Sequence, residues 1–271
     1  MKKTIFTLAA IAMGMMVNAQ IFDVQSIEKL SGASFENARV AGISPKGDYI
    51  LMTTGNTKGL QRYDLQTGKM TVISKADNAG FDVKISKTGN EIVYTEKVFQ
   101  AGKETIAKNV RANIANNTVA KVSKRVAAQE SVALYNEDGL MYVEKNGVRT
   151  QLAPFGTDYI YIWTSLSPDQ TKVCYYLGAK GCYVCDLDGS NNTFVGMDCR
   201  AAQWYDNNTL VAMHDVDDGH FVTASAIVAY TLTGKVQVLT SPDVIAMDPF
   251  AAPGKIVYST IEGDTYLMNV K

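Results

Sequence analysis

The sequence predicts an all-β fold: a six-bladed β-propeller of four-stranded antiparallel blades, with the last blade closed by the N-terminal strand. A polar turn followed by an apolar strand recurs six times along the chain. The recurrences are spaced close to the period of about 40 to 45 residues that four-stranded blades show. The last repeat has room for only three strands, and an unassigned strand-like segment precedes the first repeat.

The N-terminus has the order of a signal peptide. Two lysines precede an apolar stretch over residues 5–17, and small side chains lead up to Ala19, where a signal peptidase would cut. The apolar stretch is shorter than the roughly 20 residues that span a bilayer, and no later run is long enough. We expect a signal peptide over residues 1–19 and a single propeller domain over residues 20–271, periplasmic or secreted.

The repeats share one turn chemistry. Proline sets the backbone for the first corner of the turns at Pro45 and Pro168. Glycine, which adopts positive φ without steric cost, closes most of the turns. An apolar strand follows each turn, and in most units a third strand ends in a second polar turn, as in "CDLDGSN" and "YTLTGKV". The repeats, whose starts lie 32 to 49 residues apart, cover residues 43–52, 85–94, 134–143, 166–175, 204–213 and 249–258.

Two segments complete this assignment. Residues 103–124 are rich in Ala and Asn, and we interpret them as two strands joined at Asn116-Asn117 rather than as a helix. Residues 22–32 are predicted to add the outer strand to the last blade, because an open blade would expose its hydrogen-bonding edge. The alternative, an N-terminal tail beside a seven-bladed or open arrangement, fits the six repeats less well.

The fourth repeat carries Ser167-Pro168-Asp169 before one strand and Asp186-Leu187-Asp188-Gly189 after the next. This pattern resembles the WD40-like repeat of TolB-type periplasmic propellers, and the resemblance extends over residues 33–271. It implies a propeller in the bacterial cell envelope. TolB proteins carry an additional N-terminal α/β domain, for which this chain has no room. The hydrolase domain that prolyl oligopeptidase-type enzymes join to such blades, with its Gly-x-Ser-x-Gly elbow, is also absent.

The candidate ligand face centres on "MHDVDDGHFV", which holds the only two histidines of the chain. Two imidazoles and three carboxylates so close together could ligate a divalent metal or supply a general base. Asp-Asp-Gly is also a good turn former, so a polar hairpin explains the same residues. We expect this turn on the face where the second-to-third and fourth-to-first strand connections emerge. The ligand-face candidates are His214, Asp215, Asp217, Asp218 and His220, with His214, His220 and Asp217 as the alternative metal ligands.

The four cysteines lie in the fourth repeat and the start of the fifth. In an exported protein an even number invites a disulfide. If the hairpin turn centres on Ala179-Lys180, Cys174 faces Cys185 across the strands, and these two are the disulfide candidates. Cys182 and Cys185 stand three apart on a strand and point to opposite faces, which argues against a chelating or thioredoxin-like pair. Free thiols packed between blades are the other interpretation.

Aromatic residues at 158–163 and at Trp204-Tyr205 could line a ligand face, or they could pack between neighbouring blades. The sequence contains no phosphate-binding loop, dinucleotide fingerprint, HExxH motif or nucleophile elbow. The net charge of -1, from 26 basic and 27 acidic residues, argues against a nucleic-acid partner.

The sequence therefore predicts an exported, non-enzymatic binding or scaffold protein. Its loop face would bind an envelope or extracellular protein, peptide or glycan, without a catalytic residue, a cofactor or a membrane span. Two alternatives stay open. One is a metal-dependent lyase or hydrolase that uses the cluster around His214 and His220, and the other is a structural subunit of a surface assembly.

Overall fold

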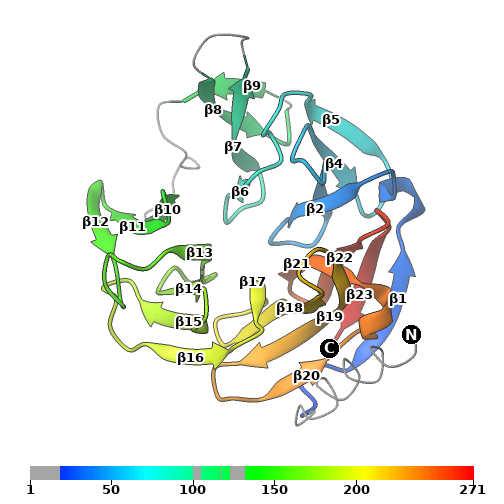
Figure 1. Ribbon diagram of the computed structural model, residues 1–271. Coiled ribbons are helices and arrows are strands. Elements are labelled where there is room, and N and C mark those ends of the chain that lie inside the picture. The colour runs from blue at the N-terminus through cyan, green and yellow to red at the C-terminus, as the bar shows by residue number, and fades with distance from the viewer. Residues whose placement is uncertain (1–18, 100–104, 117, 123–131) are drawn as a thin grey trace. The chain divides into compact units, whose positions relative to one another are not determined.

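The computed structural model describes residues 19–99, 105–116, 118–122 and 132–271 (Figure 1). Within them the chain forms 23 strands and two short 3₁₀ turns, η1 (Ser31–Ala33) and η2 (Pro242–Val244). The expected signal peptide lies outside the described residues except for Ala19. In the described part of the chain, no helix has the length and apolar character needed to cross a bilayer.

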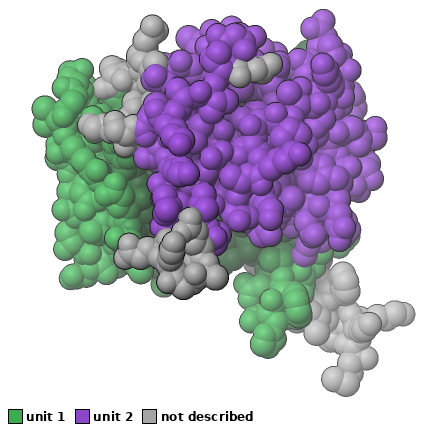
Figure 2. All heavy atoms as spheres, turned by 90° about the horizontal axis from the view of Figure 1, so that it is seen from above, with its two compact units in different colours: residues 1–26, 132–249, 269–271 green, residues 27–131, 250–268 purple. Residues whose placement is uncertain are grey.

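The chain divides into two compact units: residues 1–26, 132–249 and 269–271 form one, and residues 27–131 and 250–268 form the other (Figure 2). The second unit contains the first two blades, with strand orders β2-β3-β4-β5 and β6-β7-β8-β9. Their strands are β2 (Ala38–Ile43), β3 (Tyr49–Thr54), β4 (Leu60–Asp64), β5 (Met70–Ser74), β6 (Lys84–Ile85), β7 (Glu91–Val98), β8 (Ile106–Asn113) and β9 (Thr118–Lys121).

The first unit contains the third, fourth and fifth blades, with strand orders β10-β11-β12, β13-β14-β15-β16 and β17-β18-β19-β20. Their strands are β10 (Val132–Glu137), β11 (Leu140–Lys145), β12 (Val148–Leu152), β13 (Tyr161–Leu166), β14 (Lys172–Leu177), β15 (Gly181–Asp186), β16 (Thr193–Gly196), β17 (Arg200–Trp204), β18 (Thr209–Asp217), β19 (Val222–Thr231) and β20 (Val236–Val238).

The sixth blade joins the two ends of the chain. Its strand order is β1-β23-β22-β21, with β1 (Val24–Lys29), β21 (Ala246–Ala252), β22 (Lys255–Thr260) and β23 (Thr265–Val270). The backbones of Asp23 and Lys271 exchange two hydrogen bonds, of 2.9 and 3.0 Å. The six-bladed propeller fold and the closure of its last blade by the N-terminal strand are therefore confirmed.

The segment after β7 also follows the expectation. β8 and β9 are antiparallel strands, with Asn113 opposite Thr118, and the turn between them contains the predicted Asn116. The Ala- and Asn-rich composition therefore accompanies a hairpin rather than a helix.

The third blade differs from the repeat assignment. Its β10–β11 turn ends at Gly139, whose carbonyl accepts a 2.7 Å hydrogen bond from the backbone N–H of Tyr161, the first residue of β13. Because the strands of a blade alternate in direction, its second-to-third turn lies at the end of the sheet where the first strand of each blade starts. A turn that contacts the start of the next blade is therefore a second-to-third connection. The described strands of this blade are therefore its second, third and fourth, and the repeat placed at 134–143 was shifted by one strand. Residues 123–131, which precede β10, lie outside the described residues.

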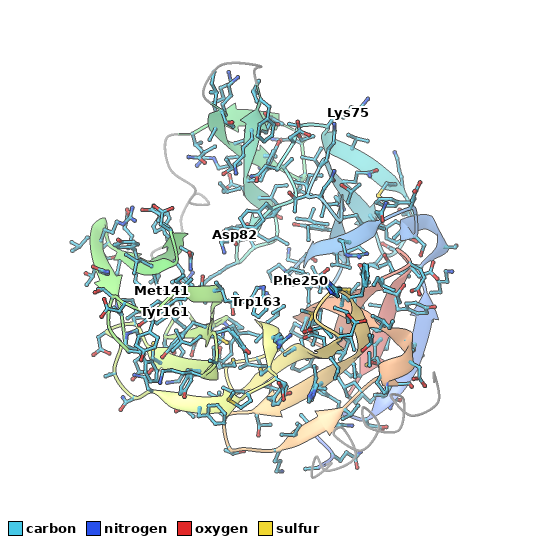
Figure 3. All side chains as sticks on the ribbon, viewed as in Figure 1. Lys75, Asp82, Met141, Tyr161, Trp163 and Phe250 are labelled. Atoms are coloured by element: carbon cyan, nitrogen blue, oxygen red, sulfur yellow. The ribbon has the colours of Figure 1, made fainter. Side chains whose placement is uncertain are left out.

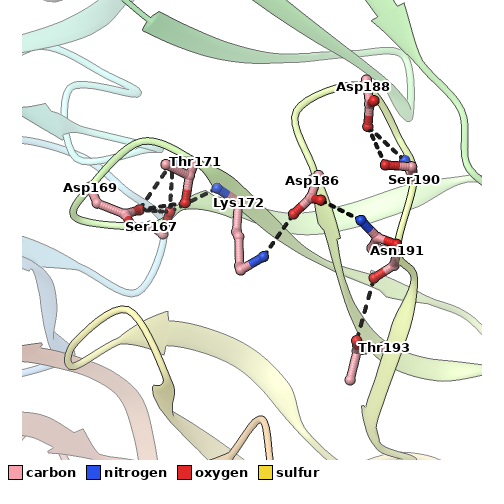
Figure 4. A network of polar contacts seen from close by, with 9 residues as sticks. All are labelled: Ser167, Asp169, Thr171, Lys172, Asp186, Asp188, Ser190, Asn191 and Thr193. Carbon is pink, nitrogen blue, oxygen red and sulfur yellow. Dashed lines mark hydrogen bonds and ion pairs between the residues drawn. The ribbon is translucent and has the colours of Figure 1, made fainter.

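The Ser-Pro-Asp and Asp-Leu-Asp-Gly turns of the fourth blade are held by their own side chains (Figure 4). The Ser167 hydroxyl accepts a 2.9 Å hydrogen bond from the backbone N–H of Lys172 and donates a 2.7 Å hydrogen bond to Asp169. The Lys172 ammonium pairs with Asp186 at 2.7 Å, and Asp188 accepts a hydrogen bond from the Ser190 hydroxyl. These motif residues therefore stabilise the turns of the blade.

The core lies between neighbouring sheets. In the first unit, buried side chains of the fourth and fifth blades pack together, and Trp204, Leu210 and Tyr230 belong to this cluster. In the second unit, Tyr49 and Leu51 of the first blade pack against Ile92 of the second. Trp204 is 6% exposed, so it belongs to the packing between blades rather than to a ligand face.

Candidate functional site

The predicted site residues lie along one hairpin of the fifth blade. β18 carries His214 and Asp215, and the turn to β19 holds Asp218 and His220. The Asp218 carboxylate accepts 2.9 Å hydrogen bonds from the backbone N–H groups of Phe221 and His220. These two bonds lower the pKa of Asp218. Asp218 therefore stabilises the turn, as the polar-hairpin interpretation expects.

The fold does not bring the two histidines together. His214 lies opposite Ala226 within the β18–β19 ladder and its side chain is 8% exposed, whereas His220 lies in the exposed turn. Over the residues that the structure describes, no group of three or more His, Cys, Asp or Glu side chains is placed to hold a metal ion. The alternative metal set of His214, Asp217 and His220 is therefore not assembled.

His214 is a packed side chain. Its Nε2 atom lies 3.8 Å from an Asp198 oxygen, and its Nδ1 atom is buried without a hydrogen-bond partner among the described residues. Burial lowers the pKa of His214, although Asp198 and Asp215 favour its charged form. The imidazole is consequently neutral near neutral pH and does not offer a cation to a ligand.

Asp215 forms an ion pair with a residue that the sequence did not single out. The Arg200 guanidinium at the start of β17 lies 2.8 Å from Asp215 and 4.0 Å from Asp217. Only 6% of the Asp215 side chain is exposed, and its second oxygen has no partner within the described chain. Burial lowers the pKa of Arg200, but Tyr176 on β14 and Asp215 raise it, and the net shift is upward. The pair thus joins β17 to β18 within the fifth blade, and the Tyr176 hydroxyl donates its own hydrogen bond to the Met197 carbonyl at 3.1 Å.

Trp163 is the third residue of β13 (Figure 3). Its backbone has φ of 49°, where β13 is bulged between Ile162 and Ser165. A left-handed conformation is uncommon for a bulky residue, but the same bulge recurs in β17, where Ala201 also has φ of 49°. The indole is 39% exposed and meets the Tyr176 ring edge-on at 5.1 Å. The bulge therefore holds a large aromatic side chain at the surface on a rigid support.

Further exposed side chains lie at and before the start of β13, in the segment that leads into β17 and in the β18–β19 turn. We call this set the blade 4–5 loop surface. Its large apolar members are exposed, although such side chains are normally buried in monomeric proteins when they occur together. The blade 4–5 loop surface consists of Ile160, Ile162, Trp163, Met197 and Phe221, with Asp198, Arg200 and Asp217 beside them.

A cavity lies elsewhere in the first unit. It has a volume of about 420 Å³, is open to solvent and is lined by Gln151, Ala153, Pro154, Thr157, Asp188 and Gly189. None of the predicted site residues lines it.

Sequence reasoning missed Arg200 and Asp198, because "MDCR" lies between two repeats and matches no motif. It named residues 158–163 as aromatic candidates, but alternation alone did not show which side chains face solvent. Tyr161 is fully buried while Trp163 two residues later is exposed, because the bulge breaks the alternation.

The cysteine pairing expected from the sequence is corrected by the strand register. Leu177 pairs with Gly181, so Cys174 lies opposite Val184 and Cys185 lies opposite Val173. The turn is centred half a residue earlier than expected, and such a one-residue change in register moves a side chain to the other face of the sheet. Cys174 and Cys185 consequently belong to different core clusters.

Comparison with known proteins supports the fold. No family model matches the chain, and no curated protein matches its sequence. TolB from Acinetobacter baumannii is similar in structure, with a TM-score of 0.58 and 13% identity over 78% of this chain and 56% of that one. This chain thus spans little more than half of that protein's length.

Two further solved structures are similar over a larger share of both chains. A putative TolB from Agrobacterium tumefaciens has a TM-score of 0.57 and 15% identity, covering 88% of this chain and 91% of that one. An oligogalacturonate lyase in complex with manganese has a TM-score of 0.54 and 13% identity, covering 84% of this chain and 76% of that one. At such identities the likeness establishes a TolB-like propeller fold and leaves the function to the site.

Proposed function

We propose that the protein is an exported binding protein that holds an apolar segment of an envelope or extracellular protein against its blade 4–5 loop surface. The observation that carries this proposal is Trp163, an exposed indole on a left-handed bulge. Exposed aromatic residues with rigid support are the usual anchors of protein interfaces. The support here runs from Trp163 through Tyr176 to Arg200 and Asp215.

A protein segment fits this surface better than a glycan. Most of the exposed side chains of the blade 4–5 loop surface are large and apolar: Ile160, Ile162, Trp163, Met197 and Phe221. The surface also carries two acidic residues. Asp217 lies 4.0 Å from the Arg200 guanidinium, and Asp198 lies 3.8 Å from the His214 imidazole. Apolar side chains flanked by a basic residue would therefore complement the surface in shape and charge.

Export is supported by the leader-like order of residues 1–19 and by the TolB-like fold. The described chain begins at Ala19, whose backbone N–H donates a 2.9 Å hydrogen bond to Val236. The backbone N–H groups of Ile21 and Phe22 donate hydrogen bonds to the Gln237 side chain, each of 2.7 Å. Cleavage after Ala19 would leave these contacts of residues 21 and 22 in place.

Site-directed photo-crosslinking in the source cells tests the proposal. A photoreactive phenylalanine analogue is placed at Ile160 or at Met197, with Val148 on β12 as an exposed control position in the same unit. We expect both surface positions to give an adduct with the same protein, and the adduct to be lost when Trp163→Ala is added. Adducts that form equally from Val148, or that are glycans, would contradict the proposal.

The metal-dependent enzyme receives no comparable support, because the described residues do not group its ligands. The lyase similarity rests on fold alone. Turnover of a small substrate that is abolished by His214→Ala, in protein that forms no adduct, would favour an enzyme instead.

A further inference from the structure

Three of the four cysteines meet inside the core between the fourth and fifth blades. Cys174 on β14, Cys182 on β15 and Cys199 before β17 are each fully buried and belong to one apolar cluster. The sulfur atoms of Cys174 and Cys182 are 3.5 Å apart, and Cys182 also interacts with Cys199. Cys185 lies in a different cluster and is separated from the three.

The strand register explains the close pair. Cys174 lies opposite Val184 and Cys182 lies opposite Tyr176, so the two cysteines are diagonal neighbours on the same face of the β14–β15 hairpin. Diagonal neighbours on twisted antiparallel strands lie close enough for their side chains to interact. Closing the present 3.5 Å separation to a bond of about 2.0 Å requires both side chains to rotate and the two strands to approach each other at this point, without a change of register.

We propose that Cys174 and Cys182 are joined by a disulfide bond when the protein folds in an oxidising compartment. The oxidant is itself a disulfide, of a protein dithiol oxidase or of oxidised glutathione. The Cys182 thiolate attacks it and releases one oxidant thiol, and the Cys174 thiolate then attacks the Cys182 sulfur and releases the second. Two protein thiols are oxidised, the oxidant disulfide is reduced to two thiols, and the two cysteine protons end on those thiols.

The bond forms before the two blades close over the pair. The hydrogen bond with Cys182 and burial raise the pKa of the Cys174 thiol. A buried, protonated thiol reacts slowly because the thiolate is the nucleophile. The folded, reduced protein should consequently resist oxidation, whereas the unfolded chain should accept the oxidant readily.

In the test, the reduced chain of residues 20–271 is refolded from denaturant in a glutathione redox buffer. The product is alkylated under denaturing conditions and mapped by mass spectrometry after proteolysis. We expect two alkylated cysteines instead of four, and a crosslinked peptide pair lighter than the reduced pair by two hydrogen atoms that joins Cys174 to Cys182. In the Cys185→Ser variant the crosslink between Cys174 and Cys182 should still form. In the Cys174→Ser variant no crosslink should form, and all three remaining cysteines should be alkylated.

Other products would overturn the assignment. Four alkylated cysteines after refolding would show that the cluster keeps its thiols. A bond between Cys182 and Cys199, or between Cys174 and Cys185, would show that another pairing is preferred. Far-ultraviolet circular dichroism of each product confirms that the chain has refolded, so a missing bond is read only on folded protein.

Discussion

Asp215 lies beneath the candidate surface rather than on it. It is 6% exposed and bonds to Arg200 at 2.8 Å, while Arg200 in turn contacts Tyr176 of the neighbouring blade. Removing one member of an ion pair with little solvent contact leaves the other charge without compensation. The residue therefore serves the site by positioning the aromatic support of Trp163, and we expect its loss to appear in stability.

Asp215→Ala should lower the free energy of unfolding by about 2–3 kcal/mol, because the partly buried Arg200 loses its partner. Urea denaturation of the mature protein measures the change. Asp217→Ala is the matched control, since Asp217 is 49% exposed and lies 4.0 Å from the same guanidinium. It should change stability by less than about 0.5 kcal/mol. Equal effects of the two substitutions would contradict the assigned role of the pair.

His214 predicts how stability depends on pH. Burial lowers its pKa in the folded protein, whereas the unfolded chain keeps a value of about 6.5. As the pH falls below about 6.5, the unfolded state binds a proton that the folded state does not, so stability decreases. His214→Asn should flatten this dependence in urea titrations between about pH 8 and pH 5. His220→Asn, which leaves the buried imidazole in place, should retain the slope of the wild type.

At the scale of elements, Gly181 at the start of β15 allows the close approach of β15 to the end of β16 within the fourth blade. Gly181 has φ of 91°, and a Cβ there would lie 2.6 Å from the carbonyl oxygen of Gly196 and 2.9 Å from the Cα of Met197. Met197 belongs to the blade 4–5 loop surface and leads into β17. The start of β15 can therefore lie against this connection only because Gly181 has no side chain.

Gly181→Ala should destabilise the protein by about 2–4 kcal/mol, since the new methyl group meets backbone atoms and the left-handed φ becomes strained. Gly178→Ala in the β14–β15 turn is the control, because a Cβ there meets nothing within 4 Å. It should stay within about 0.5 kcal/mol of the wild type in urea denaturation. If both variants unfold at the same denaturant concentration, the close approach at Gly181 does not matter.

Elements with a strong local signal could be predicted from the sequence, and those that depend on register could not. Proline, Asp and Gly mark the turns of the fourth blade because each acts on its own backbone, and the structure confirms them. The third blade was shifted by one strand, because Asp138-Gly139 closes a second-to-third turn with the same chemistry as a first-to-second turn. Trp163 and the cysteine pairing were beyond reach for a similar reason, since a bulge or a half-residue change in a turn reverses the face of a side chain.

For the molecule as a whole, the closure of the sixth blade is the central structural requirement. β1 pairs with β23 and covers an edge that would otherwise expose unpaired backbone groups. The Gln237 side chain adds hydrogen bonds to Ile21 and Phe22. The segment from Ile21 to Lys29 is thus part of the fold rather than a tail.

Deleting residues 20–29 should prevent the chain from forming a stable monomer, because the edge of β23 becomes free to pair with another molecule. Size-exclusion chromatography with light scattering and thermal denaturation measure this result. A chain that lacks only residues 1–19 is the control and should be monomeric with the full thermal transition. A stable monomer without β1 would show that the last blade does not need it.

The most direct test of the whole account measures the affinity of the partner identified by crosslinking, by isothermal titration calorimetry on purified proteins. Trp163→Ala should raise the dissociation constant for this partner by about tenfold or more, as expected for the loss of an anchoring aromatic residue. Val148→Ala, on the same unit but away from the surface, should bind like the wild type. Unchanged affinity for Trp163→Ala, with the fold intact, would contradict the assignment of the blade 4–5 loop surface as the binding site.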